Sequence, residues 1–183
     1  MKRFGFLLCA LVAAASFSAE AADSALSPAA NAAFLAAFDK KPGVVVKPDG
    51  LRYRILHNGY GLRPGPQDYV TVYYTGTLIN GQVFDGTEPG MPARFKANKL
   101  IVGWTEALSL MRVGDRWEVV IPAVLGYGES GAGEGQIPPN QTLVFELELL
   151  KVVPPKLRPH KPDEDPDKID DNEDLGPDED SGQ

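Results

Sequence analysis

Hydrophobic and polar residues alternate through the middle of the chain, and this period of two predicts β-strands. The segment 51–56 follows a Pro-Asp-Gly turn and sets Leu51, Tyr53 and Ile55 against two arginines, which is typical of a half-buried strand. Asn80-Gly81 is a strong hairpin-turn signal. Further strands are predicted at 69–78, 82–84, 94–96, 116–121 and 142–152, and residues 44–46 form a short apolar run.

A period of 3.6 residues appears in residues 104–111. Trp104, Ala107, Leu108 and Met111 fall at positions i, i+3, i+4 and i+7, so this segment is predicted to be a helix with one apolar face. One helix and about five strands with hairpin-type links predict an α+β domain, in which an antiparallel sheet packs on the helix.

A second helix is predicted at residues 29–39, before the sheet. Ser27 suits the N-cap and Pro28 the first helical position. The segment is rich in alanine and about three turns long, so it is marginal in isolation. We expect it to dock on the body, pair with another chain or stay partly frayed.

The first 22 residues have the pattern of a signal peptide. Lys2 and Arg3 precede an apolar run at 4–15, and Ala19-Glu20-Ala21 supplies a small-x-small cleavage pattern. The run is shorter than the roughly 20 residues that span a bilayer. Cys9 follows Leu8 rather than a small residue, which argues against a lipoprotein, and cleavage would leave a chain without a thiol.

The net charge of −7 comes from the end of the chain. Residues 161–183 contain eleven acidic residues and two lysines, so the remainder is nearly neutral. The Pro-rich acidic segment 154–183 is predicted to be a disordered tail, because it has too few apolar residues to offset its ordering entropy. We interpret it either as a solubilising tail or as a segment that recruits basic partners. The acidic balance excludes nucleic acid as the main partner.

Signals for cofactor, metal or nucleophilic chemistry are weak in this sequence. His57 and His160 are far apart in the chain and have no neighbouring Ser, Cys or Asp pattern, so both are predicted to be solvated. Residues 125–136 hold five glycines and are predicted to form a long mobile loop. This loop lacks the following helix and the Lys-Ser/Thr pair of a phosphate-binding loop, and we expect no cofactor and no metal.

Six stretches, in order, resemble the FK506-binding-protein (FKBP) family of peptidyl-prolyl cis-trans isomerases. They are residues 70–78, 81–85, 100–108, 121–128, 137–140 and 143–150. The lead-in at 41–46 and 50–53 is similar to the exported bacterial branch related to the macrophage infectivity potentiator (Mip). That branch usually carries a long helical dimerisation domain, whereas only a lead-in at 23–43 precedes the predicted domain at 44–153. A monomer is therefore expected.

The resemblance implies a twisted five-stranded antiparallel sheet wrapped on one short α-helix, with a substrate pocket between them. Each pocket residue has the alternative of being plain core, but Asp85 is informative, because a carboxylate directly after Phe84 is costly to bury unless it is hydrogen-bonded. Ala93 stands where many members have an aromatic residue, and Gln136 where some have an apolar one. The implied catalytic residues are Asp85, Tyr127, Trp104 and Phe84, and the implied substrate-binding residues are Tyr74, Leu100, Ile101, Ile137 and Phe145.

By the same resemblance, the chain is expected to accelerate isomerisation of X-Pro bonds while exported proteins fold. The alternative is a periplasmic peptide-binding chaperone or adaptor with little isomerase activity. The expected partners are proline-containing unfolded or nascent polypeptides, with macrolides of the FK506 and rapamycin type as inhibitors. The expected location is the periplasm, and a secreted or outer-surface location is left open.

Overall fold

The computed structural model describes residues 25–155 of the chain. The predicted signal peptide at 1–22 and nearly all of the predicted tail at 154–183 lie outside these residues, as do Cys9 and His160. The elements are α2 (Pro28–Phe38), β1 (Val44–Val46), β2 (Arg52–His57), β3 (Tyr69–Leu78), β4 (Val83–Gly86), β5 (Ala93–Lys96), α3 (Val102–Leu110), β6 (Arg116–Ile121) and β7 (Leu143–Val153), with short 3₁₀ helices at Ala123–Leu125 and Gly133–Gly135.

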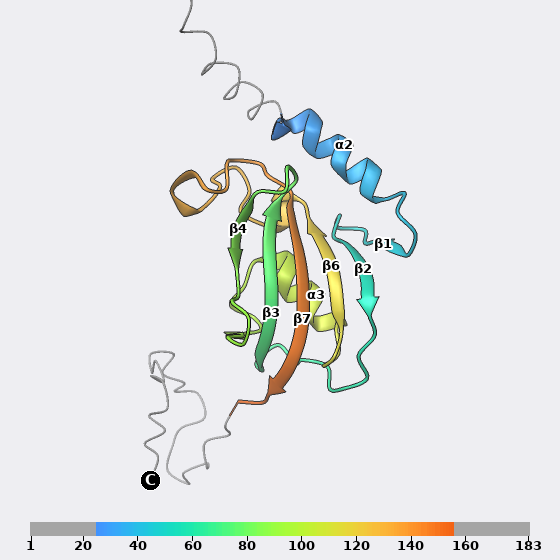
Figure 1. Cartoon of the computed structure of the whole chain (residues 1–183), viewed down its shortest axis with the longest axis vertical. Coiled ribbons are helices and arrows are strands. Elements are labelled where there is room, and N and C mark those ends of the chain that lie inside the picture. Colours follow the sequence, from blue (N-terminus) through green and yellow to red (C-terminus); the bar gives the residue numbers. More distant parts are fainter. Residues whose placement is uncertain (1–24, 156–183) are drawn as a thin grey trace, which may run out of the picture.

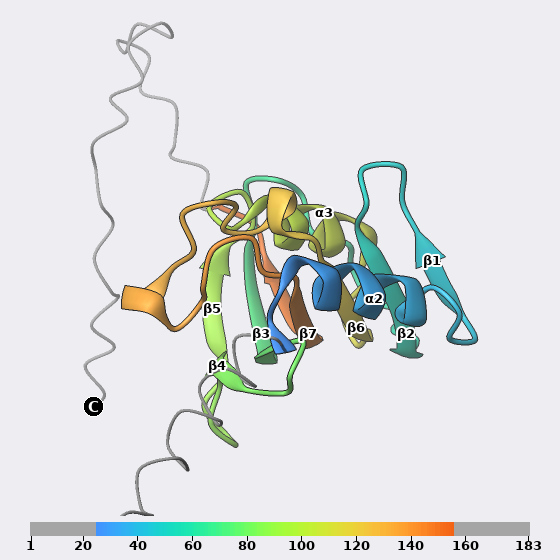
Figure 2. The same cartoon turned by 90° about the horizontal axis from the view of Figure 1, so that it is seen from above.

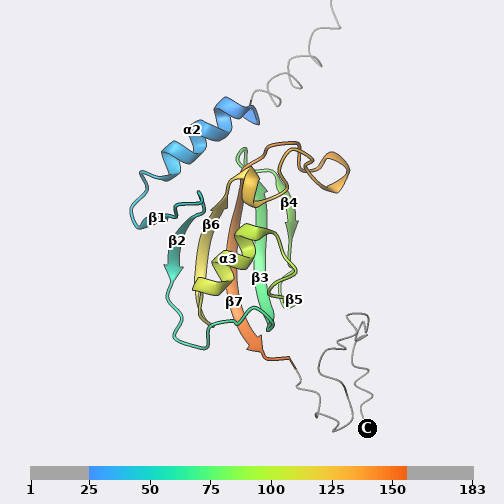
Figure 3. The ribbon, with the colours of Figure 1, turned by 180° about the vertical axis from the view of Figure 1, so that it is seen from behind.

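The strands form one antiparallel sheet, and α3 lies across one of its faces (Figures 1 and 3). The strand order is β1-β2-β6-β7-β3-β4, and β5 also pairs with β3. The α+β class is confirmed, with seven strands in place of the five expected. The short strands β4 and β5 were predicted, and they pair with different halves of β3, at residues 75–77 and 69–72. The short β1, seen in the sequence only as an apolar run, extends the opposite edge.

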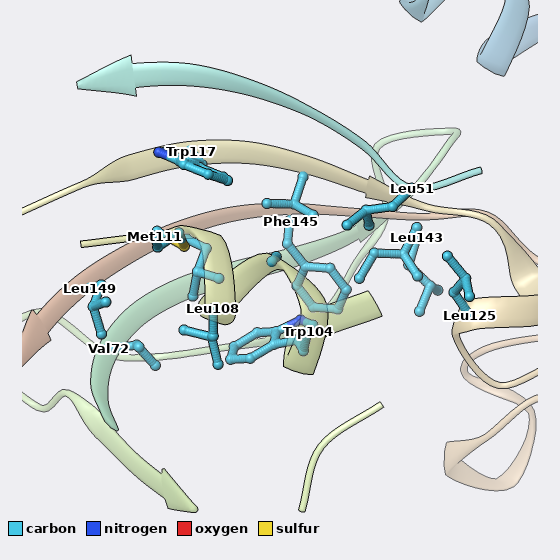
Figure 4. Packing of buried hydrophobic residues seen from close by; sticks show 14 of the residues in the cluster. Leu51, Val72, Trp104, Leu108, Met111, Trp117, Leu125, Leu143, Phe145 and Leu149 are labelled. Carbon is cyan, nitrogen blue, oxygen red and sulfur yellow. The ribbon is translucent and has the colours of Figure 1, made fainter. Parts of the chain in front are cut away.

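The core lies between α3 and the face of the sheet that the helix covers, here called the inner face (Figure 4). Leu108 and Met111 are fully buried against inward-facing residues such as Val72 and Leu149. A Cβ on Gly103 would lie 2.6 Å from Cγ2 of Ile121, far inside van der Waals contact. The glycine therefore lets the first turn of α3 lie close against β6.

The helix α2 docks on the body, which decides among the three alternatives for the N-terminal segment. Ser27 is its N-cap, with its hydroxyl accepting from the Ala30 N–H at 3.2 Å, and Pro28 opens the helix as predicted. Asn31 is buried, and its side chain donates to Oε1 of Gln141 at 3.1 Å and accepts from the Thr142 N–H at 2.8 Å. Figure 2 shows α2 alongside the body.

Two predictions about local structure need correction. Ile55 was expected to be buried with Leu51 and Tyr53, but 42% of it is exposed, because β1 pairs only with the first half of β2 and leaves the second half at the edge. The glycine-rich loop at 125–136 is partly regular. It contains the 3₁₀ turn at Gly133–Gly135, and Ala132 and Ile137 form an isolated β-bridge that closes it.

Replacement of Asn31 by Ala should detach α2 from the body, because the buried Thr142 N–H would lose its acceptor. An unsatisfied buried donor costs about 1–3 kcal/mol, so we expect the free energy of unfolding to fall by about that amount. Chemical denaturation and amide exchange across α2 measure the effect, with Ala33→Ser on the exposed side of the helix as control. Unchanged exchange in α2 of Asn31→Ala would contradict the docking role.

Candidate functional site

A cavity of about 330 Å³ opens between the start of α3 and the edge of the sheet formed by β3, β4 and β5. This volume lies within the usual range of ligand pockets. The cavity joins elements that are distant in sequence, since β7 and the segment after β6 also contribute. Its lining consists of Tyr74, Phe84, Asp85, Phe95, Lys99, Leu100, Ile101, Trp104, Tyr127 and Phe145.

The base of the cavity is an aromatic cluster centred on Trp104, which is only 4% exposed. The rings of Tyr74, Phe145 and Phe95 meet the Trp104 ring edge to face, with centroids 5.1, 5.3 and 5.8 Å away and interplanar angles of 88°. Figure 4 shows the Phe145 ring beside Trp104. Each such pair contributes about 0.5–1.5 kcal/mol beyond its buried area. We call these four rings, together with the ring of Phe84, the cup. The cup is apolar, and these contacts hold it in one arrangement.

Gly76 of β3 makes room for two of the cup's rings. A Cβ there would lie 2.7 Å from Cε1 of Phe145 and 2.8 Å from Cζ of Phe84. The absence of a side chain allows these two rings to meet edge to face over the strand, with centroids 5.6 Å apart. The glycine thus helps to set the shape of the wall.

Asp85 lies at the exposed rim, and two donors orient its carboxylate. The Tyr74 hydroxyl donates to Oδ2 at 2.8 Å, and the Gly86 N–H donates to Oδ1 at 2.8 Å. The carboxylate has the hydrogen bonds that the sequence led us to expect. It is exposed rather than buried, however, and Phe84 before it is half-buried. The carboxylate therefore faces the cavity in a defined orientation.

Burial raises the pKa of Tyr74 well above its ordinary value, and the hydrogen bond to Asp85 and the charge of that carboxylate raise it further. Burial and the Asp85 charge likewise raise the pKa of Tyr127. Both phenols are protonated donors at neutral pH, as an ordinary tyrosine is, and the raised pKa values extend this state to higher pH. The Tyr74 proton is used by Asp85, whereas within residues 25–155 the Tyr127 hydroxyl has no hydrogen-bond partner.

A second free donor is the backbone N–H of Ile101, the residue that precedes α3. Its carbonyl accepts from the N–H groups of Trp104 and Thr105 at 3.0 and 3.1 Å. Its own N–H has no acceptor in the described part of the chain, and Ile101 lines the cavity. The cavity therefore combines an apolar base with two unused donors, Ile101 N–H and Tyr127 Oη.

Eight of the nine residues predicted for the site line this cavity. Ile137 does not: it is 6% exposed, belongs to the core and is held by its backbone bridge to Ala132. The sequence reasoning missed Phe95 and Lys99. Ala93 stands where many family members have an aromatic residue, and Phe95, two residues later, supplies an aromatic ring to the cavity. The alternation of charged Arg94 and Lys96 around Phe95 could have indicated that this ring faces inward.

A larger hollow of about 410 Å³ lies elsewhere, where the loop before β5 borders β3, β6 and β7. Its lining includes Arg116, Glu146 and Glu148, and Nη1 of Arg116 lies 3.5 Å from Oε1 of Glu146. This hollow therefore contains side chains of both charges, and Trp104 is not part of its lining. Across 25–155 there is also no cluster of three or more potential metal ligands, and His57 is exposed.

Comparison with known proteins places this geometry in a family. Residues 61–150 match the family model described as FKBP-type peptidyl-prolyl cis-trans isomerase. The chain is 54% identical over 121 residues to an outer membrane protein MIP of Legionella longbeachae, covering 66% of this chain and 52% of that protein. It is 51% identical over 115 residues to an FKBP-type 22 kDa peptidyl-prolyl cis-trans isomerase of Escherichia coli, covering 62% and 55%.

A solved structure agrees with the sequence relatives. The crystal structure of a peptidyl-prolyl cis-trans isomerase from Pseudomonas syringae pv. tomato superposes with a TM-score of 0.64 at 39% identity, covering 72% of this chain and 95% of that one. The fold is therefore FKBP-like, and the chain belongs to the FKBP-type peptidyl-prolyl cis-trans isomerase family. It spans about half the length of the curated relatives it matches.

Replacement of Gly76 by Ala should deform the cup, because the new methyl group overlaps the Phe145 and Phe84 rings. Overpacking of this kind costs about 1–3 kcal/mol, and we expect a loss of stability of that size together with a change in the near-ultraviolet circular dichroism of the aromatic cluster. Thr75→Ala, at the neighbouring exposed position, is the control. Wild-type stability and spectrum in Gly76→Ala would show that the rings tolerate the methyl group.

The raised pKa of Tyr74 predicts a loss of stability in alkali. The folded state favours the protonated phenol. The contribution of Tyr74 to the free energy of unfolding is therefore fully present below the unfolded pKa of about 10 and is lost as pH rises above that value. Urea midpoints between pH 8 and 11 should therefore fall more steeply for the wild type than for Tyr74→Phe. Parallel curves for the two proteins would contradict the assignment.

Proposed function

We propose that this chain is a peptidyl-prolyl cis-trans isomerase that accelerates X-Pro isomerisation in exported proteins as they fold. The observation that carries the proposal is the apolar cup on Trp104 with two donors, Ile101 N–H and Tyr127 Oη, that have no partner in the described part of the chain. The family membership supports the same reaction. In this proposal the cup holds the proline ring, and the two donors bind substrate carbonyls.

Rotation about an X-Pro bond is slow because it breaks amide resonance. Rotation about a peptide bond has a barrier of about 18–20 kcal/mol, and X-Pro bonds isomerise in tens to hundreds of seconds in water. No covalent bond between heavy atoms forms or breaks, so the reaction requires no nucleophile and no general acid. A site of rings and hydrogen-bond donors is sufficient for such chemistry.

The apolar base favours the twisted amide over the planar one. When the amide twists, conjugation is lost and its carbonyl becomes less polar, so it prefers an apolar environment to water. Trp104 and Phe145, which are 4% and 3% exposed, supply that environment. Catalysis then follows from binding the twisted form more tightly than either planar form.

Asp85 acts at the twisting carbonyl in this proposal. Its carboxylate is oriented by the Tyr74 hydroxyl and the Gly86 N–H, so it enters the reaction without reorganisation. A fixed charge beside the reacting group contributes more than a mobile one, because its orientation costs nothing during the reaction. Phe84, the residue before Asp85 on β4, lines the same cavity.

The proposed partners are proline-containing unfolded or nascent polypeptides, with macrolides of the FK506 and rapamycin type as inhibitors of the same cup. We propose that residues 44–153 form the isomerase domain, after a signal peptide at 1–22 and a lead-in at 23–43, and that the chain acts as a monomer in the periplasm. The signal pattern and a relative named as an outer membrane protein support export. In the part of the chain that the structure describes, no helix is long and apolar enough to cross a membrane.

A second candidate function is that of a chaperone or adaptor with little isomerase activity. Val102 follows Ile101 in the chain, and Val124 lies three residues before Tyr127. These two valines are 59% and 77% exposed. Exposed apolar side chains close in sequence to lining residues favour holding unfolded segments. The two functions use the same cavity but differ in whether the twisted amide is stabilised.

Proline-limited refolding and a protease-coupled peptide assay on residues 23–183 test the site. Because hydrogen bonds to charged groups contribute about 1.5–3 kcal/mol, we expect Asp85→Leu to lower kcat/KM by roughly ten- to a hundredfold. Tyr127→Phe, which removes a neutral donor, should lower it by roughly two- to tenfold. Glu88→Leu removes an exposed carboxylate outside the lining and serves as the control.

The same assays separate the two functions. Wild-type rates in both Asp85→Leu and Tyr127→Phe would refute the site assignment. An inactive wild type that still suppresses aggregation of an unfolded protein would favour the chaperone. Inhibition by FK506 of the isomerase activity would locate that activity in the cup.

A further inference from the structure

Three cations gather on the outer face of the sheet, which is the face opposite α3. Arg94 and Lys96 lie on β5, and Lys151 lies on β7. Thr71 of β3 pairs with Arg94 on one side and with Lys151 on the other, so Arg94, Thr71 and Lys151 form one row across the strands. Lys96 pairs with Tyr69, two residues before Thr71, and therefore points to the same face. Directly paired residues of antiparallel strands point to the same face. We call Arg94, Lys96 and Lys151 the basic cluster.

Successive side chains of a strand point to opposite faces of the sheet, so the basic cluster points away from the core. Phe95, between Arg94 and Lys96, lines the cavity on the inner face, and Val70 and Val72 on either side of Thr71 are fully buried. In Figure 1 the outer face is turned to the viewer, and neither described helix crosses it. The cluster is therefore open to a ligand.

The charges of the basic cluster have no counterpart within residues 25–155. The ion pairs described there involve Lys41, Lys47, Arg52, Arg54 and Arg116, and none involves the cluster. Arg94 instead lies over the Tyr69 ring, 4.5 Å from its centroid. Glu148, the nearest outward carboxylate before Lys151 on β7, pairs in register with Tyr73 and not with the cluster.

The chain leaves the sheet beside this cluster. Val153, the last residue of β7, pairs with Tyr69, and Tyr69 pairs with Lys96. Shortly afterwards the sequence becomes strongly acidic, with all eleven acidic residues of the segment 161–183 falling within 163–180. The greatest excess of negative charge in the chain therefore begins about ten residues after Val153.

We propose that the acidic segment 163–180 binds the basic cluster of its own chain. The nine residues 154–162 can extend over at most about 30 Å. Two strand spacings, about 10 Å, separate β7 from β5, so the connection is long enough. Each exposed ion pair is weak, but several carboxylates act together and the tether supplies a high effective concentration. The tail then neutralises its own body before it meets other proteins.

Carbodiimide cross-linking of the full chain without its signal peptide tests this, because the reagent joins only lysines and carboxylates in contact. We expect links from Lys96 and Lys151 to peptides of 163–180, and few from Lys40 and Lys41, which are exposed just before β1 at the opposite edge of the sheet. The links should decrease several-fold between 0.01 M and 1 M salt, as the Debye length falls from about 30 Å to about 3 Å. Equal linking of all four lysines would overturn the proposal.

Proteolysis at the tail's own glutamates gives an independent readout. Cleavage by a Glu-specific protease at low salt should be several-fold faster in Lys96→Gln/Lys151→Gln than in the wild type, and unchanged in the matched control Lys40→Gln/Lys41→Gln. Equal rates in all three proteins would refute the contact. A mixture of isotopically light and heavy chains identifies links between molecules, and a predominance of these would assign the cluster to a second copy instead.

Discussion

The packing of Trp104 against the inner face of the sheet is the contact on which the rest of the site depends. It requires the first turn of α3 to lie close to β6, which Gly103 permits by leaving space for Ile121. Once the indole lies there, Tyr74 and Phe145 meet it edge to face and the base of the cup is complete. The same placement puts Ile101, the residue before the helix, in the lining of the cavity, with an N–H that has no acceptor within residues 25–155.

The site separates an apolar base from a polar rim. Trp104 and Phe145 are almost fully buried, whereas Asp85 is exposed and is oriented by Tyr74 and Gly86. This division avoids the cost of burying a carboxylate while keeping its charge at the edge of the apolar volume. Burial and the nearby carboxylate also disfavour tyrosinate, so both phenols stay protonated to a higher pH than an ordinary tyrosine.

Most strands were predictable, long and short, but the role of a residue within a short strand was not. The bounds of β3 and β6 agree with the predicted strands, because ten and six residues are enough for a period of two to be read. The four-residue β5 was also predicted, at residues 94–96, but so short a strand does not show which side chain faces the site, and Phe95 was overlooked in favour of Ala93. Ile137 was assigned to the cavity from family order, but its burial in the core depends on how the loop before it closes onto Ala132.

The sequence by itself determined the strand and helix periods, the family motifs in their order and the separation of an almost neutral body from an acidic end. These properties are local or additive, so they can be read along the chain. Only the tertiary structure decided which rings enclose one cavity, that Tyr74 orients Asp85 and that Arg94 and Lys151 lie on either side of Thr71. Such contacts depend on strand register and on the close approach of α3, which arise when distant segments pack together.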